Sequence, residues 1–336
     1  MKSAILESPG FFNIVEKRPR ELNKDEILIK VVFAGICGSD ISSYLGRNLL
    51  ISYPAKLGHE LVGEVVKIGK NIKHIKKGDF IVAKPIITCG KCLYCSSGNY
   101  NLCTSIEGMD GAFSDYIIIN EKMAFKIPKN SNLKEMVFTE PLAVAIHVFK
   151  VSRAKKNEKV LIIGAGTIGQ LVLQVAKSSG VKYVGISDII ESKLKLAKDI
   201  GADFVLRVNK HLNIKTVIKD TYFDVVFDCV SNDSSIANAI NSANKKGRII
   251  VVGQAHKNLS LDMCSIMHNE LSIFGSFIYN NKDFIDAIGL INKNKINCAN
   301  YISKIFNLFD IQKAFNEIVE NGNQYIKCLI GPPITR

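Results

Sequence analysis

The fold of the second half of this chain is decided by residues 160–169, VLIIGAGTIG, where an apolar run leads directly into three closely spaced glycines. The run Val160–Ile163 predicts a buried strand, and the amphipathic pattern after the glycines predicts a helix. Outward from this segment strands alternate with helices, which indicates a parallel sheet covered on both faces. The expected strands are Tyr183–Ser187, Phe223–Cys229, Arg248–Val252 and Leu271–Tyr279, and the expected helices are Ile168–Ser179, Glu191–Ile200 and Ser234–Ala243.

The glycines form the pattern G-x-G-x-x-G between a strand and a helix, the position that a dinucleotide-binding loop requires. Gly164 permits the tight turn, Gly166 lets the backbone approach a diphosphate, and Gly169 lets the helix lie close to the strand. Thr167 and Ile168 lie where the helix starts and are expected to bind the cofactor, because the unpaired N–H groups of the helix N-terminus would face the phosphates.

An acidic residue indicates which dinucleotide the loop binds. Asp188 ends the second strand, about twenty residues after the glycines. A carboxylate there accepts hydrogen bonds from the adenosine ribose and repels a 2′-phosphate, which favours NAD over NADP. The alternative is that the glycines serve only a turn and that Asp188 caps the following helix.

The rest of the chain has a different character. Its first third contains short β-rich runs that suggest a partly open barrel or sandwich; they are Ile27–Phe33, Glu60–Ile68, Asp79–Ala83 and Ala112–Ile119. After residue 280 the pattern predicts two helices and two strands, Lys282–Lys293, Ile302–Leu308, Ile311–Val319 and Tyr325–Ile330. By pattern alone this final stretch could extend the parallel sheet or return to the first third.

Four of the nine cysteines are clustered as Cys89-x2-Cys92-x2-Cys95-x7-Cys103. This spacing suits a closed tetrahedral site of four thiolates, which holds a loop in place and does no chemistry. Zinc is the expected metal, and an iron–sulfur cluster is the rival. Clustered cysteines of this kind indicate metal binding rather than disulfides.

A second group of possible metal ligands is dispersed along the chain. Cys37 follows a strand, His59 and Glu60 begin another, and Glu140 precedes the α/β region. Cysteine, histidine and carboxylate are zinc ligands, and three of them with an open position make a catalytic site. Taken singly, each also has a structural explanation, such as a buried thiol, a core histidine or a carboxylate at a helix N-terminus.

Together the motifs resemble those of the zinc-containing medium-chain dehydrogenases, the zinc alcohol dehydrogenase superfamily. The resemblance rests on Gly58-His59-Glu60-x2-Gly63-x5-Gly69, on Gly-Ile-Cys-Gly-Ser-Asp at 35–40 and on the four cysteines, in that family's order. It implies an α/β protein: a GroES-like catalytic domain over 1–145 with a zinc lobe at 85–105, a Rossmann domain over 146–280, and a segment, 281–336, that returns to the catalytic domain. The active site would lie in the cleft.

The resemblance also implies two zinc ions per chain, one catalytic and one structural. Cys37, His59 and Glu60 would hold the catalytic zinc, and Glu140 would reach it directly or through water. The Glu-Pro-Leu run at 140–142 is similar to that of polyol and butanediol dehydrogenases, where simple alcohol dehydrogenases have a cysteine. Asp40 would orient His59.

The implied reaction is hydride transfer from a zinc-activated alcohol to NAD, with a polyol or sugar-alcohol phosphate as substrate. Ser39 stands at the family's proton-relay position, but Ser42 replaces the relay histidine. Tyr279 matches a polyol-binding tyrosine, whereas Ile278 replaces the neighbouring arginine, so sorbitol itself is a poor candidate. Two further residues have possible roles: Tyr44 in the substrate pocket or in packing, and Lys193 near the adenosine or in solvent.

Composition limits the partners. The net charge is +13, but the lysines are dispersed, so no nucleic acid is expected as partner. No signal peptide or membrane-spanning stretch is evident, which favours a cytoplasmic protein that does not bind membranes. The apolar strand Leu271–Tyr279 would lie at a sheet edge and suggests a homodimer or homotetramer.

Other functions stay open at this point. Within the same chemistry the alternatives are 2,3-butanediol and threonine dehydrogenases, although the latter usually have Asp-Pro at the position of Glu140-Pro141. A different class is a nicotinamide-binding redox sensor without turnover, which would not need an open metal site.

Overall fold

The computed structural model describes residues 1–48, 51–109, 111–209, 214–218, 221–321 and 324–332. The chain divides into two compact units. Met1–Glu140 and Asn280–Arg336 together make the first unit, and Pro141–Tyr279 makes the second. The helix α4 (Thr139–Ser152) begins at the boundary between them.

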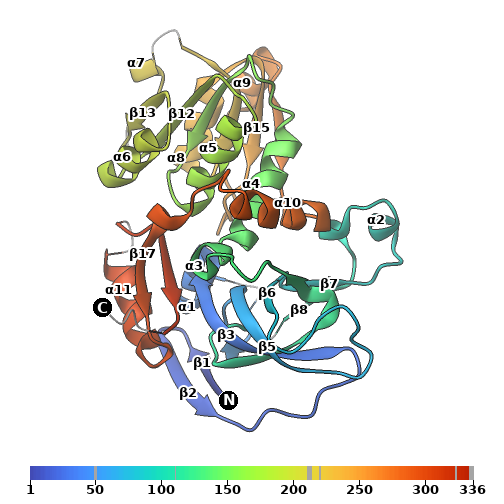
Figure 1. The fold of residues 1–336 in the computed structure, drawn as a ribbon. Coiled ribbons are helices and arrows are strands. Elements are labelled where there is room, and N and C mark those ends of the chain that lie inside the picture. Colours follow the sequence, from blue (N-terminus) through green and yellow to red (C-terminus); the bar gives the residue numbers. More distant parts are fainter. Residues whose placement is uncertain (49–50, 110, 210–213, 219–220, 322–323, 333–336) are drawn as a thin grey trace. The chain divides into compact units, whose positions relative to one another are not determined.

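The second unit contains a six-stranded parallel sheet, with the order β13-β12-β11-β14-β15-β16 (Figure 1). Its strands are β11 (Lys159–Ile163), β12 (Tyr183–Asp188), β13 (Phe204–Arg207), β14 (Phe223–Asp228), β15 (Ala243–Val251) and β16 (Ser272–Gly275). Its helices are α5 (Thr167–Ser178), α6 (Glu191–Asp199), α7 (Lys215–Ile218), α8 (Asp233–Ser242) and α9 (Met263–His268). The central strands are apolar and fully buried, for example at Leu161 and Val226, because helices cover both faces of a parallel sheet. The predicted fold class is confirmed.

The last strand of this sheet is shorter than the sequence predicted. The prediction extended it over Leu271–Tyr279, but β16 ends at Gly275. Ile278 adopts a left-handed backbone conformation, with φ of 53°, which is incompatible with a continued strand. β16 lies at the edge of the sheet, as expected.

The first unit is organised around the long strand β3 (Glu26–Ile36). The main sheet has the order β10-β6-β5-β3-β18-β17, and β9 also pairs with β3. Smaller sheets have the orders β2-β1-β4 and β7-β8. The remaining strands are β1 (Lys2–Ser8), β2 (Phe11–Glu16), β4 (Ala55–Lys56), β5 (Glu60–Ile68), β6 (Phe80–Ala83), β7 (Ile86–Thr88), β8 (Ile106–Gly108), β9 (Tyr116–Asn120), β10 (Ala124–Lys126), β17 (Ile302–Phe306) and β18 (Lys327–Ile330).

Pairing across β3 brings distant parts of the sequence together. Gly35 near the end of β3 is opposite Glu60 at the start of β5, and Ile36 is opposite Cys328 of β18. The C-terminal strand therefore lies beside the strand that leads to Cys37. This corner of the sheet carries Cys37, His59 and Glu60, three of the four ligands predicted for the catalytic zinc.

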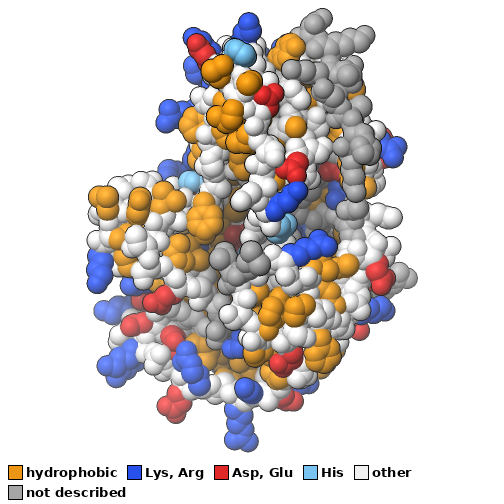
Figure 2. Space-filling model, turned by 180° about the vertical axis from the view of Figure 1, so that it is seen from behind, with side chains coloured by type: hydrophobic (Ala, Val, Ile, Leu, Met, Phe, Trp, Pro, Cys, Tyr) orange, Lys and Arg blue, Asp and Glu red, His pale blue; other side chains and the backbone are white. Residues whose placement is uncertain are grey.

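The helices of the first unit are short except for the two from the C-terminal segment. They are α1 (Gly38–Tyr44), α2 (Leu93–Ser96), α3 (Leu133–Met136), α10 (Asn281–Asn292) and α11 (Ile311–Asn321), with single turns at Tyr100–Leu102, Glu121–Met123, Ala299–Tyr301 and Leu308–Asp310. Within the described residues, no helix is long and apolar enough to cross a bilayer. Figure 2 shows basic side chains interspersed with acidic and neutral ones over the face in view rather than gathered into one patch.

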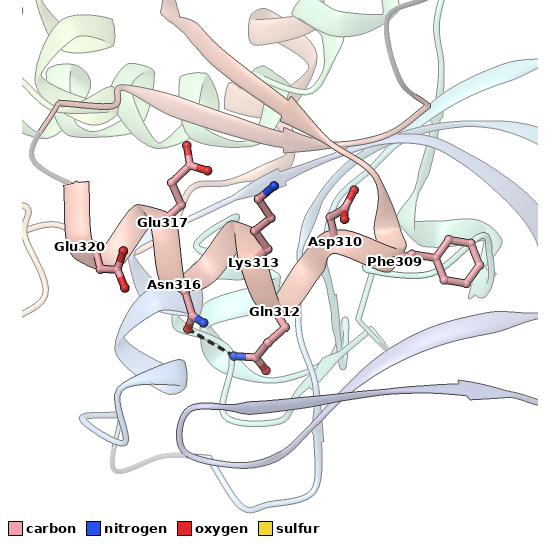
Figure 3. A pocket seen from close by; sticks show the side chains of 7 residues that line it. All are labelled: Phe309, Asp310, Gln312, Lys313, Asn316, Glu317 and Glu320. Atoms are coloured by element: carbon pink, nitrogen blue, oxygen red, sulfur yellow. Dashed lines mark hydrogen bonds between the residues drawn. The ribbon is translucent and has the colours of Figure 1, made fainter.

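A surface hollow lies over α11, and one of the residues that line it, Gln312, bonds Tyr44. The hollow is lined by Phe309, Asp310, Gln312, Lys313, Asn316, Glu317 and Glu320 (Figure 3). The amide of Gln312 donates to the Tyr44 hydroxyl at 2.6 Å, and that hydroxyl donates to the Gly10 carbonyl at 2.9 Å. The Tyr44 ring packs against Phe12 and Phe315. These contacts favour the packing role for Tyr44 over the role in a substrate pocket.

Candidate functional site

The candidate catalytic centre begins where β3 ends. Cys37 follows Ile36 and is the N-cap of α1, and its backbone N–H donates to the Asp40 carboxylate at 2.9 Å. Acidic side chains at this position of a helix satisfy backbone N–H groups that have no partner within the helix. The helix α1 was not predicted, because its seven residues, GSDISSY, show no amphipathic period.

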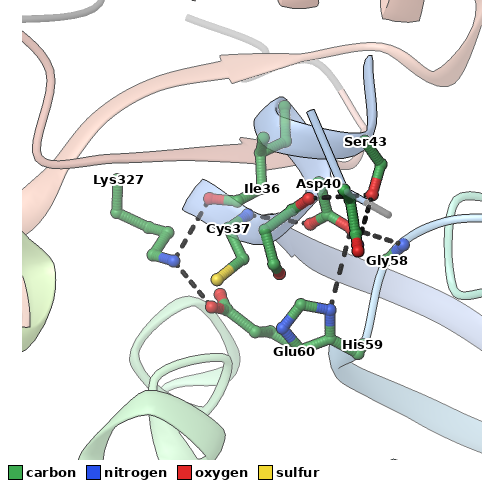
Figure 4. Close-up of polar contacts among 10 residues, drawn as sticks. Ile36, Cys37, Asp40, Ser43, Gly58, His59, Glu60 and Lys327 are labelled. Carbon is green, nitrogen blue, oxygen red and sulfur yellow. Dashed lines mark hydrogen bonds and ion pairs between the residues drawn. The ribbon is translucent and has the colours of Figure 1, made fainter. Parts of the chain in front are cut away.

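Asp40 also fixes the chain around His59 (Figure 4). Its other oxygen accepts from the Gly58 N–H at 3.1 Å and lies 3.7 Å from Nδ1 of His59. Gly58 has a φ of +90°, and a Cβ there would meet the Phe113 ring at 2.9 Å, so glycine is needed for this turn. Asp40 is 3% exposed and lies beside His59, which it is predicted to orient.

The imidazole of His59 is strongly affected by this environment. Burial lowers the pKa of His59, but the charge and hydrogen bonding of Asp40 and Cys37 outweigh burial and hold the pKa well above its usual value. A metal ion and a proton would compete for the same ring nitrogen.

Glu60 supplies a buried carboxylate to the same cluster. It is fully buried; its Oε1 pairs with Nζ of Lys327 at 2.7 Å, while its Oε2 has no hydrogen-bond partner among the described residues. An unsatisfied buried polar atom costs about 1–3 kcal/mol. A Cβ on Gly35 would collide with Oε2, so the glycine leaves the space that this oxygen occupies.

These observations fit a metal ion. One ligand atom from each of Cys37, His59 and Glu60 lies within 4.8 Å of the other two, and Figure 4 shows the Cys37 sulfur beside the Glu60 carboxylate. A cation bound among them would satisfy the free oxygen of Glu60. Thiolate, imidazole and carboxylate are the donor set of a zinc site that keeps a position open.

Two other predicted residues lie outside this cluster. Glu140 is in the first turn of α4 and is 9% exposed, but it is not one of the three converging side chains. It lies close enough to Lys327 for its charge to raise the pKa of that lysine. Ser39 is partly buried in α1, where its carbonyl accepts from the Ser43 hydroxyl at 3.0 Å.

Lys327 was missed by the sequence reading. It is 3% exposed, and it bonds the Ile36 carbonyl at 3.2 Å in addition to Glu60. Burial lowers the pKa of Lys327, but the negative charges of Glu60, Cys37 and Glu140 more than compensate and raise it. The signal was present: a single lysine in the otherwise apolar run from Tyr325 to Ile330.

The four clustered cysteines converge as predicted for a structural metal site. Their sulfur atoms are 4.0 Å apart for Cys89 and Cys95, 3.9 Å for Cys92 and Cys103, and 3.5 Å for Cys89 and Cys103. A tetrahedron with Zn–S bonds of about 2.3 Å has edges of about 3.8 Å, so the sulfurs are placed to hold zinc.

Backbone N–H groups support these thiolates. The N–H of Cys92 points to the Cys89 sulfur at 3.4 Å, and the N–H groups of Cys89 and Ser105 point to the Cys103 sulfur at 3.3 Å. Hydrogen bonds of the same kind, chiefly from Thr104 and Cys95, lower the pKa of Cys92 to about 6. Thiolate is the form that binds metal.

The glycine loop in the second unit has the geometry that a dinucleotide needs. Gly164 has a φ of +97°, a Cβ on Gly169 would collide with the Gly164 carbonyl, and a Cβ on Gly166 would meet no protein atom within 4 Å. The open side at Gly166 is where a diphosphate can approach, at the N-terminus of the 12-residue helix α5 that starts at Thr167 and Ile168.

Asp188 holds this loop in place. Its Oδ2 accepts from the Ala165 N–H at 2.7 Å, and its Oδ1 accepts from the Ile190 N–H at 2.9 Å. Each oxygen retains a lone pair for a ribose hydroxyl. Lys193 is partly buried, and burial lowers its pKa against the opposing charge of Asp188.

A surface pocket adjoins Asp188. Its lining residues are Ile189, Arg207, Val208 and Asn209, and Arg207 is opposite Asp188 in the strand register. This places the pocket at the carboxyl ends of β12 and β13, where doubly wound folds bind the adenosine of a dinucleotide.

Known proteins are similar to this chain in sequence and in fold. A family model described as "Alcohol dehydrogenase GroES-like domain" matches residues 23–129, and another described as "Zinc-binding dehydrogenase" matches residues 167–293. The D-arabitol-phosphate dehydrogenase of Enterococcus avium is 33% identical over 344 residues, which cover 98% of this chain and 97% of that protein. The structure of galactitol-1-phosphate dehydrogenase from Escherichia coli aligns with a TM-score of 0.91 at 27% identity, covering 99% of this chain and 100% of that one.

Two further similar structures contain a cofactor. A dehydrogenase from Escherichia coli CFT073, 30% identical with a TM-score of 0.92 and 99% coverage of both chains, is complexed with NADH. A zinc-binding dehydrogenase from Sinorhizobium meliloti 1021, 27% identical with a TM-score of 0.88 and covering 98% of this chain and 99% of its own, is bound to NADP.

The chain therefore belongs to the zinc-binding dehydrogenases of the alcohol dehydrogenase family, and it is an oxidoreductase that converts an alcohol CH–OH group to a ketone. Within that family its similarity is to the polyol and sugar-alcohol phosphate dehydrogenases. The resemblance predicted from the motifs is confirmed.

Exchange of Asp40 for asparagine should weaken both metal binding and activity. The amide can accept only on one side, so it cannot serve the N–H groups of Cys37 and Gly58 and also support His59. Loss of such a supporting carboxylate typically reduces metal affinity or activity by about 10- to 100-fold. Zinc affinity and kcat/KM would be measured, with Asp25→Asn at an exposed position of the same unit as the control. Unchanged values in Asp40→Asn would contradict the orienting role.

Proposed function

We propose that this protein oxidises a secondary alcohol of a polyol or a sugar-alcohol phosphate with NAD as acceptor. The observation that carries the proposal is the convergence of Cys37, His59 and Glu60 around a carboxylate oxygen that has no partner among the described residues. Zinc held there would act as a Lewis acid on the substrate hydroxyl. A mere nicotinamide-binding sensor would not require an open site of this kind.

The chain's own residues supply orientation and proton transfer. Asp40 holds His59 in a fixed orientation, and Glu60 is held by Lys327. Ser39 is the proposed relay: its hydroxyl would pass its own proton to solvent as it accepts the proton of the substrate. Glu140 would reach a bound metal directly or through water. Tyr279, which is 1% exposed, is the proposed substrate contact.

The choice of a phosphorylated substrate rests on three observations. The compared relatives include an arabitol-phosphate and a galactitol-1-phosphate dehydrogenase. Ile278 stands where polyol dehydrogenases for free sorbitol place an arginine, and the chain has a net charge of +13, which attracts anionic ligands. The alternatives are 2,3-butanediol and threonine.

The direct test is a substrate panel in which appearance of the reduced cofactor is followed. It would pair arabitol and galactitol with their phosphates and add sorbitol, threonine and 2,3-butanediol, each with NAD and with NADP. We expect the highest kcat/KM with a sugar-alcohol phosphate and NAD. Exclusive turnover of 2,3-butanediol or threonine would refute the substrate class. If a protein that carries two zinc ions turns over no member of the panel, the result would support the alternative function, a nicotinamide-binding redox sensor.

The cofactor preference should depend on Asp188. Removal of its carboxylate in Asp188→Ser takes away an acceptor for the ribose and leaves Arg207 of the same pocket facing a possible 2′-phosphate. We expect KM for NAD to rise roughly 10- to 100-fold, from ~1.5–3 kcal/mol for hydrogen bonds to a charged group, while KM for NADP falls. The control is Asp199→Ser, an exposed exchange on α6. If NADP is already preferred by the unaltered protein, the assignment of NAD is wrong.

We also propose that the protein is a homodimer or homotetramer that associates through the edge strand β16. Phe277, just beyond this strand, is 57% exposed, and an unpaired edge invites pairing with a second copy. Light scattering should give a dimer or tetramer at micromolar concentration, and Phe277→Lys should weaken association by about tenfold, the scale of one interface contact. Phe11→Lys, at 56% exposure in the first unit, is the matched control. A monomeric unaltered protein would overturn this proposal.

A further inference from the structure

A buried lysine lies within the candidate catalytic centre, and the function proposed so far uses it only to hold Glu60. Lys327 projects from β18 toward β3 and β5, where its ammonium reaches Oε1 of Glu60 and the Ile36 carbonyl (Figure 4). Both partners of the ion pair are almost completely buried, at 3% and 0% side-chain exposure. Lys327 therefore contacts one proposed metal ligand, Glu60, directly. It also bonds the carbonyl of the residue that precedes another proposed ligand, Cys37.

Stability alone is a poor explanation for this pair. Desolvation of two buried charges offsets most of their attraction, and well-packed apolar side chains of similar size are often as stable or more so. The pair also leaves Oε2 of Glu60 without a partner among the described residues, and Gly35 makes room for that oxygen. A pair built only for stability would satisfy both oxygens.

The charges of the ligand set indicate a role. A cysteine thiolate and a glutamate carboxylate together cancel the two charges of a divalent ion, which weakens its power to polarise a substrate hydroxyl. A lysine ammonium in contact with the carboxylate adds one positive charge to the same buried region. It also binds one of the two carboxylate oxygens and leaves only the other for the metal.

We propose that Lys327 is a positioning residue that restricts Glu60 to ligation through Oε2 and keeps the loaded centre electropositive. This inference rests on the proposed metal site of Cys37, His59 and Glu60. The positive charge of Lys327 would repel the metal ion, so Lys327 would oppose metal binding while it supports catalysis. Replacement by a neutral side chain should therefore make zinc bind more tightly and turn over substrate more slowly.

A purely structural role predicts the opposite sign for zinc. If Lys327 only supports Glu60, its loss should loosen the ligand cluster and release zinc faster. The exchange Lys327→Met keeps the length of the side chain and removes the charge, whereas Lys327→Arg keeps the charge. The sign of the change in zinc retention in Lys327→Met thus separates the two roles.

The experiment measures zinc transfer from the intact protein to an excess of a coloured chelator, together with kcat for the best substrate. We expect Lys327→Met to release the zinc of the Cys37 site at least about tenfold more slowly and to lose kcat by about 10- to 100-fold. Lys327→Arg should remain within about threefold of the unaltered protein on both measures. The zinc of the four-cysteine lobe serves as an internal control, whose release should not change.

Faster release of zinc from Lys327→Met, or no change in release, would overturn the proposal. Lys327→Gln, a neutral side chain that can still donate to Glu60, replaces Lys327→Met if the latter fails to fold, and the same signs apply. Failure of the proposed function is distinguishable, because an unaltered protein that holds two zinc ions without turnover would refute the function and leave the zinc-release prediction to be judged by itself. An absent metal site is a different result, in which the unaltered protein holds only the lobe zinc. That result would refute the metal site itself, and the inference with it.

Discussion

Cys37→Ser should abolish alcohol oxidation while the chain remains folded. Cys37 is the N-cap of α1, and its sulfur would bind zinc as a thiolate, whereas serine in its place is a neutral hydroxyl with little affinity for zinc. The Lewis acid contributes several kcal/mol to stabilisation of the transition state. We therefore expect kcat to fall by at least about three orders of magnitude, since each ~1.4 kcal/mol is a factor of ten.

The measurement combines turnover with metal content. Zinc per chain should fall from two to one, with the lobe zinc retained, and circular dichroism should be unchanged. Cys264→Ser is the control, because this cysteine is exposed on α9 in the second unit. Retention of two zinc ions and of more than a tenth of the activity in Cys37→Ser would show that Cys37 is not a ligand.

Cys103→Ser should remove the other zinc and destabilise the lobe. This segment has almost no regular structure of its own, since α2 is only four residues long, and short helices do not persist alone in water. Leu93, Tyr94 and Leu102 are exposed on it, so little apolar burial holds it together. Figure 2 shows hydrophobic side chains on the surface of the projecting lobe. Its order therefore depends on the metal.

For this variant we expect one zinc per chain, rapid proteolysis between residues 89 and 103, and a fall in Tm of about 10 °C. The last value corresponds to a few kcal/mol in a unit of this size. Residual kcat at low temperature should stay within about tenfold of that of the unaltered protein, because the lobe cysteines form a group separate from Cys37, His59 and Glu60. Cys264→Ser is again the control. Unchanged zinc content and protease resistance would contradict a structural metal site in the lobe.

Local spacing was sufficient to predict part of the site. The glycine loop and the four cysteines are each contained in a short segment, so the distances along the chain limit the distances in space. The structure places Gly166 against open space and brings the four sulfurs together. Asp188 is close to the loop because parallel pairing brings the ends of β11 and β12 together.

The catalytic centre could not be derived in that way. Its ligands meet only because β3 and β5 pair with Gly35 opposite Glu60, a register that no local pattern specifies. The family resemblance supplied Cys37, His59 and Glu60 as a group. It did not supply Lys327, which reaches Glu60 from β18 at the far end of the chain. The predicted length of the last strand of the parallel sheet was also wrong. The left-handed conformation of Ile278 ends the extended run, and an isoleucine in the sequence does not indicate such a conformation.

The most direct test of the catalytic centre is anomalous diffraction at the zinc edge, from crystals of a preparation that oxidises a sugar-alcohol phosphate. We expect two peaks per chain. One should lie among the four sulfurs of the lobe, and the other within about 2.0–2.3 Å of the Cys37 sulfur and a His59 nitrogen. A single peak in the lobe, in crystals of active protein, would contradict the account.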